Sequence, residues 1–318
     1  MSTKLHDDFE YKIVIAGLDN AGKTSALIAL RMKYNFYERV KDLKPTIKID
    51  YNSFKFLKTY HINLWDMGGQ KKFREIYLAN PIYFSETNFI YYLIDIQDDL
   101  KFEDSVQYLH KLLEIYRDLG YSNEVIVCFS KFDPKYRNIE EYLERKKMLE
   151  NLILSQNKDM KFRFFNISYY DISSISKAMS YSLSRLLKLD KLNDFLTSLI
   201  TDFECNYAIL YTDSGLIIAD DYKNTMDIKT FEETISGRIN DDLEFFQRLV
   251  DEGVDINERS TIFEDKIDYV KLILVNTKEQ QNFFYLGIST KLMNLEKIKK
   301  GFSKIQTILN QSFTETKS

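Results

Sequence analysis

Residues 17–24 read Gly-Leu-Asp-Asn-Ala-Gly-Lys-Thr, and they lie between an apolar run at residues 11–16 and a helical pattern that begins at Ser25. The pattern is G-x-x-x-x-G-K-[ST] in the order strand, tight loop, helix. Its glycines permit a turn that directs backbone N–H groups at phosphate oxygens, and the helix presents its positive end to the same anion. Lys23 can reach the β- and γ-phosphates, and the Thr24 hydroxyl can ligate Mg²⁺. Because a chance glycine-rich turn rarely meets every position in this context, the stretch predicts a site for a nucleoside triphosphate and magnesium.

The composition indicates a protein whose domains have hydrophobic cores. At 318 residues it is long enough for about two domains, and 44% of its residues are hydrophobic. The net charge of −4 gives no general attraction to nucleic acid or anionic lipid. Cys128 and Cys205 lie in apolar runs in different halves of the chain. We therefore expect two buried thiols rather than a disulfide, as in a reducing cytoplasm.

We expect no membrane-targeting or lipidation signal at either end of the sequence. The start of the chain has no apolar signal region, Ser2 excludes N-myristoylation, and no prenylation cysteine ends the chain. No apolar stretch reaches the length of a membrane span. We expect a cytoplasmic protein with no direct membrane anchor, which partners would recruit to membranes.

Strand and helix patterns alternate over the first part of the chain, which predicts an α/β fold with a mostly parallel, doubly wound sheet. The expected strands are residues 11–16, 48–56, 60–65, 88–96, 124–129 and 161–167, and the expected helices are residues 24–33, 105–119, 139–156 and 175–189.

The rest of the chain has a different order, helix-strand-strand-helix-strand-strand-strand-helix. Its first two strands flank a hairpin turn at residues 213–215, where Gly215 permits a positive φ. This order predicts a smaller α+β domain with an antiparallel five-stranded sheet. We place the domains at residues 1–188 and 189–318, with a helix as the connection because no Gly/Pro/Ser linker separates them. The expected elements are helices 192–202, 230–250 and 292–311 and strands 207–212, 216–219, 260–263, 269–276 and 283–288.

Two further segments complete a phosphate site. Asp66, at the end of a predicted strand, can hold Mg²⁺ through water, the Gly69 N–H can bind the γ-phosphate, and Gln70 can orient an attacking water. Thr46, in the loop before the second strand, can place its hydroxyl on Mg²⁺ and its N–H on the γ-phosphate. The alternatives are a structural Gly-Gly turn and an ordinary loop threonine.

The identity of the nucleotide base is predicted from residues that follow the last two strands of the first sheet. The Asp133 carboxylate can accept hydrogen bonds from guanine N1 and N2, whereas adenine has no such pair of donors. The stem of Lys131 would cover the base. Ser168 and Tyr169 are placed to offer a backbone N–H to guanine O6. The site therefore favours GTP over ATP.

These motifs together resemble the small GTPases. Residues 17–24 and 65–70 are similar to the Arf branch, whereas residues 64–73 and 165–171 also resemble the Rag/Gtr branch. The second domain resembles the roadblock/longin-like domain of Rag/Gtr proteins, through its element order and residues 213–219. The resemblance implies a GTP-binding switch that forms a homo- or heterodimer through this domain. It also implies roadblock scaffold proteins, an exchange factor and an activating protein as partners.

The sequence departs from the small GTPases in three ways. Ser130 stands where the base motif usually has an Asn that braces the phosphate loop, although Rag-type proteins also lack this Asn. We expect nucleotide affinity to be weaker by about 1–2 kcal/mol for the missing hydrogen bonds. Ser2 and a short polar lead-in argue against an Arf-type membrane helix. Only Lys44, and no arginine, precedes Thr46 in its loop, so we expect slow intrinsic hydrolysis that a partner's arginine would accelerate.

The sequence thus predicts a slow GTPase switch. One alternative is a nucleotide-stabilised assembly scaffold that does not cycle, and another is an ATP-using P-loop enzyme. The expected catalytic residues are Lys23, Gly69 and Gln70, and the expected Mg²⁺ ligands are Thr24, Thr46 and Asp66. The residues expected to contact GTP or GDP are Asp19, Asn20, Ala21, Gly22, Lys23, Thr24, Ser25, Thr46, Gly69, Ser130, Lys131, Asp133, Ser168 and Tyr169.

Overall fold

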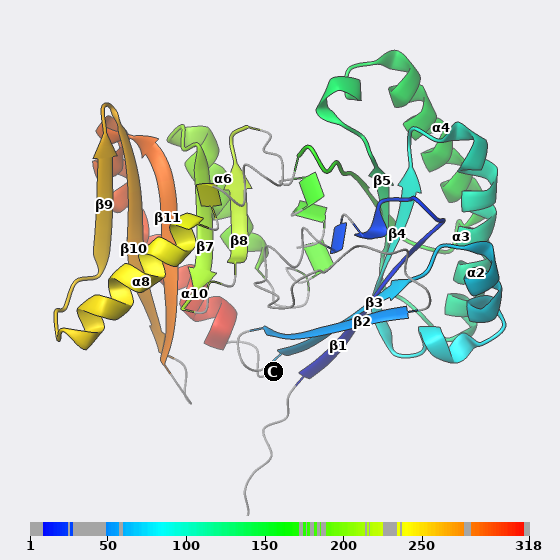
Figure 1. Cartoon of the computed structure of the whole chain (residues 1–318), viewed down its shortest axis with the longest axis horizontal. Helices are drawn as coiled ribbons and strands as arrows, with labels where there is room; N and C mark the ends of the chain where they lie inside the picture. The colour runs from blue at the N-terminus through cyan, green and yellow to red at the C-terminus, as the bar shows by residue number, and fades with distance from the viewer. Residues whose placement is uncertain are drawn as a thin grey trace, which may run out of the picture. The chain divides into compact units, whose positions relative to one another are not determined.

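The computed structural model divides by its internal contacts into two compact units (Figure 1). The described residues up to Ser174 form one unit, and those from Ile175 onward form the other. This division lies ahead of the boundary that we expected after residue 188. The structure describes residues 9–24, 26–27, 49–56, 60–171, 174–175, 177–178, 181–182, 185, 189–213, 215, 217–224, 234–235, 237–276 and 281–314.

The first unit contains a mostly parallel sheet. In the described part of the chain it has six strands in the order β2-β3-β1-β4-β5-β6, of which only β2 runs antiparallel to its neighbour. This confirms the fold class expected for the first domain. The strands are β1 (Phe9–Gly17), β2 (Ile49–Phe56), β3 (Tyr60–Met67), β4 (Thr87–Asp95), β5 (Val125–Ser130) and β6 (Phe162–Asn166).

Helices α2 (Lys71–Leu78), α3 (Phe102–Asp118) and α4 (Glu140–Gln156) lie together on one side of this sheet (Figure 1). The apolar positions of α3 recur at helical spacing and are buried against the sheet, whereas α4 buries only Leu149 and Ile153 among its many charged residues. Strand β5 is buried throughout, as its continuous apolar run predicts. Short 3₁₀ turns follow three elements, at η1 (Pro81–Phe84), η2 (Asp99–Lys101) and η3 (Pro134–Tyr136).

The second unit contains an antiparallel sheet, which confirms the expected α+β architecture. Its described strands follow the order β8-β7-β11-β10-β9. Helices α6 and α10 pack on one face of this sheet, and α8 lies on the opposite face (Figure 1). The strands are β7 (Tyr207–Thr212), β8 (Ile217–Tyr222), β9 (Glu258–Phe263), β10 (Lys266–Asn276) and β11 (Gln281–Lys291). The helices are α6 (Asp190–Asp202), α8 (Gly237–Asp251), η5 (Leu292–Asn294), α9 (Leu295–Lys299) and α10 (Phe302–Thr314).

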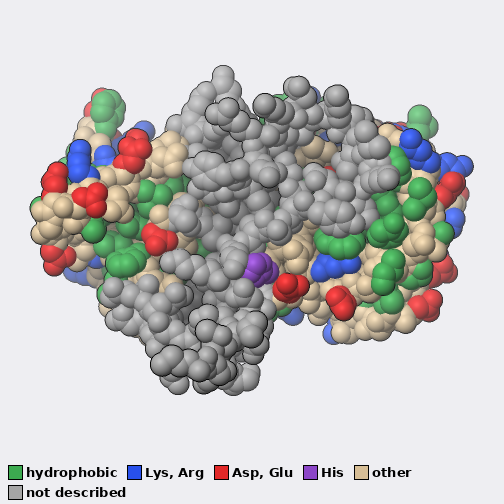
Figure 2. All heavy atoms as spheres, turned by 60° about the horizontal axis from the view of Figure 1, so that its bottom comes forward, with side chains coloured by type: hydrophobic (Ala, Val, Ile, Leu, Met, Phe, Trp, Pro, Cys, Tyr) green, Lys and Arg blue, Asp and Glu red, His purple; other side chains and the backbone are tan. Residues whose placement is uncertain are grey.

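The surface and the cysteines agree with the composition. On the face shown in Figure 2, the coloured acidic and basic side chains are interspersed rather than gathered by sign. Cys128 and Cys205 are buried free thiols, as the sequence predicted. Within the described ranges, no helix has both the length and the hydropathy of a membrane span.

Candidate functional site

The loops that follow β1, β3, β5 and β6 meet at one edge of the first sheet. Parallel pairing brings their strand ends together: Ile15 of β1 lies opposite Asp66 of β3, and Asp95 of β4 lies opposite Ser130 of β5. Ligands of open α/β sheets bind in the crevice outside the carboxyl ends of the strands. The sequence motifs are therefore gathered where such a fold holds a ligand.

The phosphate loop turns tightly on residues with positive φ. Gly17 has φ 147°, Asn20 has φ 64° and Gly22 has φ 79°. A Cβ on Gly17 would lie 2.5 Å from the carbonyl oxygen of Leu93 on β4, so this position admits only glycine. The Ala26 N–H then donates to the Gly22 carbonyl at 3.1 Å, which begins the helix that follows the loop.

Lys23 lies inside the loop rather than in solvent. Its Nζ donates to the carbonyl oxygens of Gly17 at 3.1 Å and Leu18 at 2.6 Å, and the residue is only 7% exposed. Burial lowers the pKa of Lys23 to about 8, although the nearby carboxylates of Asp66 and Asp19 act to raise it. The loop thus holds a desolvated cation, which favours an arriving anion.

The segment after β3 packs directly on the phosphate loop. The Asp19 N–H donates to the Gly69 carbonyl oxygen at 3.1 Å. A Cβ on Gly69 would lie 2.3 Å from the Asp19 nitrogen and 2.4 Å from the Leu18 carbonyl carbon, so any other residue would force the two segments apart. Gln70 follows as the N-cap residue of α2, and its side chain makes no capping hydrogen bond. The Gly69 backbone therefore lies directly against the phosphate loop.

Ser130 braces the phosphate loop, which corrects the expectation that this contact is lost. Its hydroxyl donates to the Ala21 carbonyl oxygen at 2.8 Å and to the Ile94 carbonyl oxygen at 3.1 Å. The short side chain reaches the loop because β5 ends beside it: a Cβ on Gly22 would lie 3.3 Å from the Ser130 Cβ. A contact between this position and the phosphate loop is therefore kept, and the effect of Ser130 on nucleotide affinity stays a prediction.

The base-recognition residues also lie together. Asp133 is 8% exposed, and its Oδ1 accepts a 2.6 Å hydrogen bond from the Ser168 hydroxyl. The Phe132 N–H donates to the Ile167 carbonyl oxygen at 3.0 Å, which ties the loop after β5 to the loop after β6. Tyr169, next in the second loop, is 45% exposed. The carboxylate is therefore fixed between two loops, at the edge where a purine would lie.

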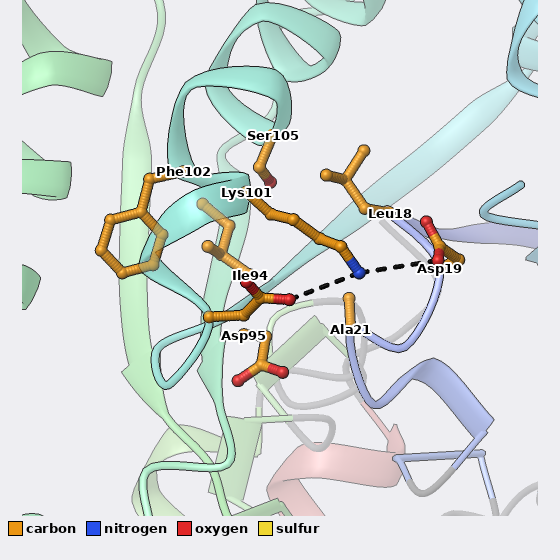
Figure 3. Close-up of a pocket in the computed structure, with 9 residues that line it drawn as sticks. Leu18, Asp19, Ala21, Ile94, Asp95, Lys101, Phe102 and Ser105 are labelled. Atoms are coloured by element: carbon orange, nitrogen blue, oxygen red, sulfur yellow. Dashed lines mark ion pairs between the residues drawn. The ribbon is translucent and has the colours of Figure 1, made fainter. Parts of the chain in front are cut away.

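Two ion pairs near the site carried no sequence signal. The Arg137 guanidinium contacts the buried Asp171 carboxylate at 2.6 Å, which holds the loop after β6 against η3. Lys101, at the start of α3, pairs with Asp19 of the phosphate loop at 3.6 Å (Figure 3). The Lys101 ammonium also contacts its near neighbour in the sequence, Asp98, at 3.3 Å. Arg137 and Asp171 lie far apart in the sequence, as do Lys101 and Asp19, and only the fold brings the members of these two pairs together.

Other expected site residues differ in how far the structure describes them. Thr24 begins the helix after the phosphate loop and is half-buried, and Lys131 lies beside Asp133 with φ 57°. Ser25 and Thr46 lie outside the described residues.

The fold and the site define a class of protein: a P-loop α/β protein that binds a nucleoside phosphate. Comparison with protein families makes the assignment narrower. The Gtr1/RagA G protein conserved region matches residues 12–239, more than half of the chain. The chain therefore belongs to the Gtr1/RagA family of G proteins, and it is a small GTPase of the Arf/Rag type that binds guanine nucleotide. This confirms the resemblance drawn from the motifs.

The chain is also similar to individual proteins. The chain is 27% identical over 180 residues to ADP-ribosylation factor-like protein alp41 of Schizosaccharomyces pombe, covering 57% of this chain and 88% of the relative. It is 36% identical over 113 residues to ADP-ribosylation factor-like protein 2 of Dictyostelium discoideum, covering 36% of this chain and 56% of the relative. A similar solved structure is the Arl6 BBS3 small GTPase from Trypanosoma brucei with bound GppNp. Its TM-score is 0.45 at 19% identity, covering 56% of this chain and 98% of that one.

Proposed function

We propose that this GTPase is a slow molecular switch that reports its nucleotide state through a dimer formed by the second unit. The observation that carries the switch is the 3.1 Å hydrogen bond from the Asp19 N–H to the Gly69 carbonyl oxygen. Backbone N–H groups of a phosphate loop are the donors that bind phosphate oxygens. A phosphate that takes the Asp19 N–H must therefore separate it from Gly69, so nucleotide binding and the position of the segment after β3 are coupled.

The same loop supplies the charge that hydrolysis needs. On phosphate binding, the Lys23 ammonium would exchange its bonds to loop carbonyls for the β- and γ-phosphate oxygens. The Gly69 N–H would stabilise charge on the γ-phosphate, and Gln70 would orient the attacking water for in-line displacement. A partner would accelerate this reaction by supplying an arginine, because the loop before Thr46 has none.

Magnesium fits the oxygen ligands at this edge of the sheet. Asp66 is 2% exposed at the end of β3, and its charge partly opposes the lowering of the Lys23 pKa by burial, so its carboxylate lies near the phosphate loop. Thr24 and Asp66, with Thr46, would hold the ion. When bound, the ion would neutralise charge on the phosphate oxygens. The described residues include no cluster of three or more His, Cys, Asp or Glu that could hold a metal ion.

A Gln70→Leu variant tests the catalytic assignment. Single-turnover GTP hydrolysis should slow by at least about tenfold, because removing a positioned catalytic group costs 1.36 kcal/mol or more of barrier. GTP affinity should change little. Gln107→Leu, on an exposed turn of α3, is the matched control. A Gln70→Leu rate equal to that of the wild type would support the alternative, a nucleotide-stabilised scaffold that does not cycle.

The nucleotide bound to the purified protein tests the base assignment. Chromatography of the released nucleotide should give GDP or GTP, because Asp133 is placed to accept from guanine N1 and N2. Asp133→Asn should lose this selectivity. Adenine nucleotide in the wild-type protein would overturn the role of Asp133 and support an ATP-using enzyme.

The dimer is supported by the exposed edge of the second sheet. β9 is an edge strand, and its Ile262 and Phe263 side chains are 57% and 73% exposed. Unpaired edge strands with apolar side chains pair readily with another chain. We propose that a second copy or a related chain covers this edge, as in a roadblock-like domain. Scaffold proteins, an exchange factor and an activating protein would then act on a cytoplasmic dimer that partners recruit to membranes.

Light scattering on the full-length protein tests the dimer. We expect a dimer mass for the wild type, or for the wild type with its partner chain, and a monomer for Phe263→Asp. Val250→Asp is the control, because Val250 is 69% exposed on α8 rather than on the edge strand. If Phe263→Asp assembles as the wild type does, β9 is not the interface.

A further inference from the structure

Gln97 joins the end of β4 to the base-recognition loop. Its Nε2 donates to the Lys131 carbonyl oxygen at 2.7 Å and to the Asp133 Oδ2 at 3.2 Å. Its own backbone N–H donates to the Asp95 Oδ1 at 3.0 Å, which fixes the residue relative to β4. One side-chain amide thus contacts both the backbone and the carboxylate of the loop that reads the base.

The two oxygens of Asp133 are held from opposite sides. Oδ1 accepts from the Ser168 hydroxyl at 2.6 Å, and Oδ2 accepts from Gln97. Each carboxylate oxygen has two acceptor sites, so each retains one for another donor. With a single donor the carboxylate could rotate about its terminal torsion, which is broad. With a donor on each oxygen its plane is fixed, and the remaining acceptor sites have defined directions.

The backbone of the loop depends on the same residue. Lys131 has φ 57°, a left-handed conformation that non-glycine residues seldom adopt unless the surroundings determine it. The Gln97 amide bonds the Lys131 carbonyl, and the Asp95 Oδ2 pairs with the Lys131 Nζ at 2.6 Å. Asp95 therefore holds Gln97 with one oxygen and Lys131 with the other. This network keeps the strained residue in place between β5 and Asp133.

We propose that Gln97 is a positioning residue for guanine selectivity. It orients the Asp133 carboxylate so that guanine N1–H and the guanine 2-amino group each meet one oxygen. This inference rests on the proposed contact between Asp133 and the base. Gln97 itself need not touch the nucleotide, because it acts on the carboxylate and on the backbone that carries it.

Comparison of GDP with inosine diphosphate tests the proposal, because inosine lacks the 2-amino group of guanine. Dissociation constants would be measured for both nucleotides by displacement of a fluorescent GDP on the full-length protein. The Gln97→Met variant keeps the length of the side chain and removes its donor. We expect GDP affinity to fall about tenfold and inosine diphosphate affinity to fall less, so that the preference for GDP shrinks. Gln97→Asn, which keeps the amide on a shorter stem, should give an intermediate preference.

Controls separate this inference from the assignment beneath it. Gln107→Met, on the exposed surface of α3, should leave the preference unchanged. If Asp133→Asn abolishes the preference for GDP but both Gln97 variants keep it, the role of Gln97 is refuted and the base assignment stands. If Asp133→Asn also keeps the preference, the base assignment fails. A Gln97 variant that loses thermal stability but keeps the wild-type ratio of the two affinities would show a purely structural role and overturn the proposal.

Discussion

The buried ammonium of Lys23 should make nucleotide affinity depend on pH. Burial lowers the pKa of Lys23 to about 8 in this structure. The lysine is then about nine-tenths charged at pH 7 and about one-quarter charged at pH 8.5. Bound phosphate favours the charged form and would raise the pKa again. The protein must therefore take up a proton when nucleotide binds above pH 8.

The expected loss of affinity follows from these fractions. The dissociation constant of GDP should rise about fourfold from pH 7 to pH 8.5, because the charged fraction falls by that factor. Stability of the nucleotide-free protein should change in the opposite direction. A lysine whose pKa is depressed by folding is penalised while it is charged, so its contribution to the unfolding free energy rises as pH passes through 8.

Displacement titrations at pH 7, 7.5, 8 and 8.5 at fixed magnesium would measure the change. Lys23→Arg is the control, because its guanidinium stays charged over this pH range. All other titrating groups of the protein and the nucleotide are the same in this variant as in the wild type. Calorimetry of the wild type at pH 8.5, in buffers of different ionisation enthalpy, should find about three-quarters of a proton taken up per nucleotide. Equal pH slopes for the two proteins, with no proton uptake, would refute the assignment of a desolvated Lys23.

Three other substitutions probe the contacts around the loop. Ser130→Ala removes the one hydroxyl proton that Ser130 shares between the Ala21 and Ile94 carbonyl oxygens, so the free energy of GDP binding or of unfolding should fall by about 1–3 kcal/mol. The exposed Ser155→Ala should be neutral, and equal behaviour of the two variants would contradict the brace. Gly69→Ala would place a Cβ 2.3 Å from the Asp19 nitrogen, so we expect slower single-turnover hydrolysis with GDP binding retained, and a wild-type rate would count against the close approach. Lys101→Met would leave the Asp19 carboxylate uncompensated near the phosphates, so GTP affinity should fall severalfold more than GDP affinity, and Asp19→Asn in the same protein should restore it. The pair is half-exposed and contributes at most about 1 kcal/mol to stability, so unchanged GTP affinity would mean that it is only a surface contact.

The sequence predicted what depends on local pattern. The phosphate loop, the continuous apolar strand β5 and the amphipathic α3 each carry their own signal over a short stretch. Both sheet types followed from the order of these elements. Element ends were displaced by a few residues: α3 spans Phe102–Asp118 where residues 105–119 were expected, and β9 spans Glu258–Phe263 where residues 260–263 were expected.

The contacts between distant segments could not be predicted from the sequence in the same way. Ser130 was interpreted by its residue type, as a loss of asparagine, whereas its effect depends on how near β5 ends to the phosphate loop. That distance follows from strand register and packing. Gln97 was not singled out, because one glutamine after a strand has no pattern until Asp133 is placed beside it. Sequence motifs therefore predicted the groups that would meet the nucleotide, and the structure added the groups that hold them.

The hydrogen bond between Asp19 and Gly69 implies reciprocity between nucleotide and partner proteins. Coupling between two binding events is symmetric in free energy: each changes the affinity for the other by the same factor. Consider a partner protein that binds α2 and favours the contact of Gly69 with the loop. Such a partner must weaken nucleotide binding, and nucleotide must weaken the binding of the partner by the same factor. A protein that favours separation of Gly69 from the loop must do the reverse. One donor shared by two acceptors would thus make the change in partner affinity on nucleotide binding equal to the change in nucleotide affinity on partner binding.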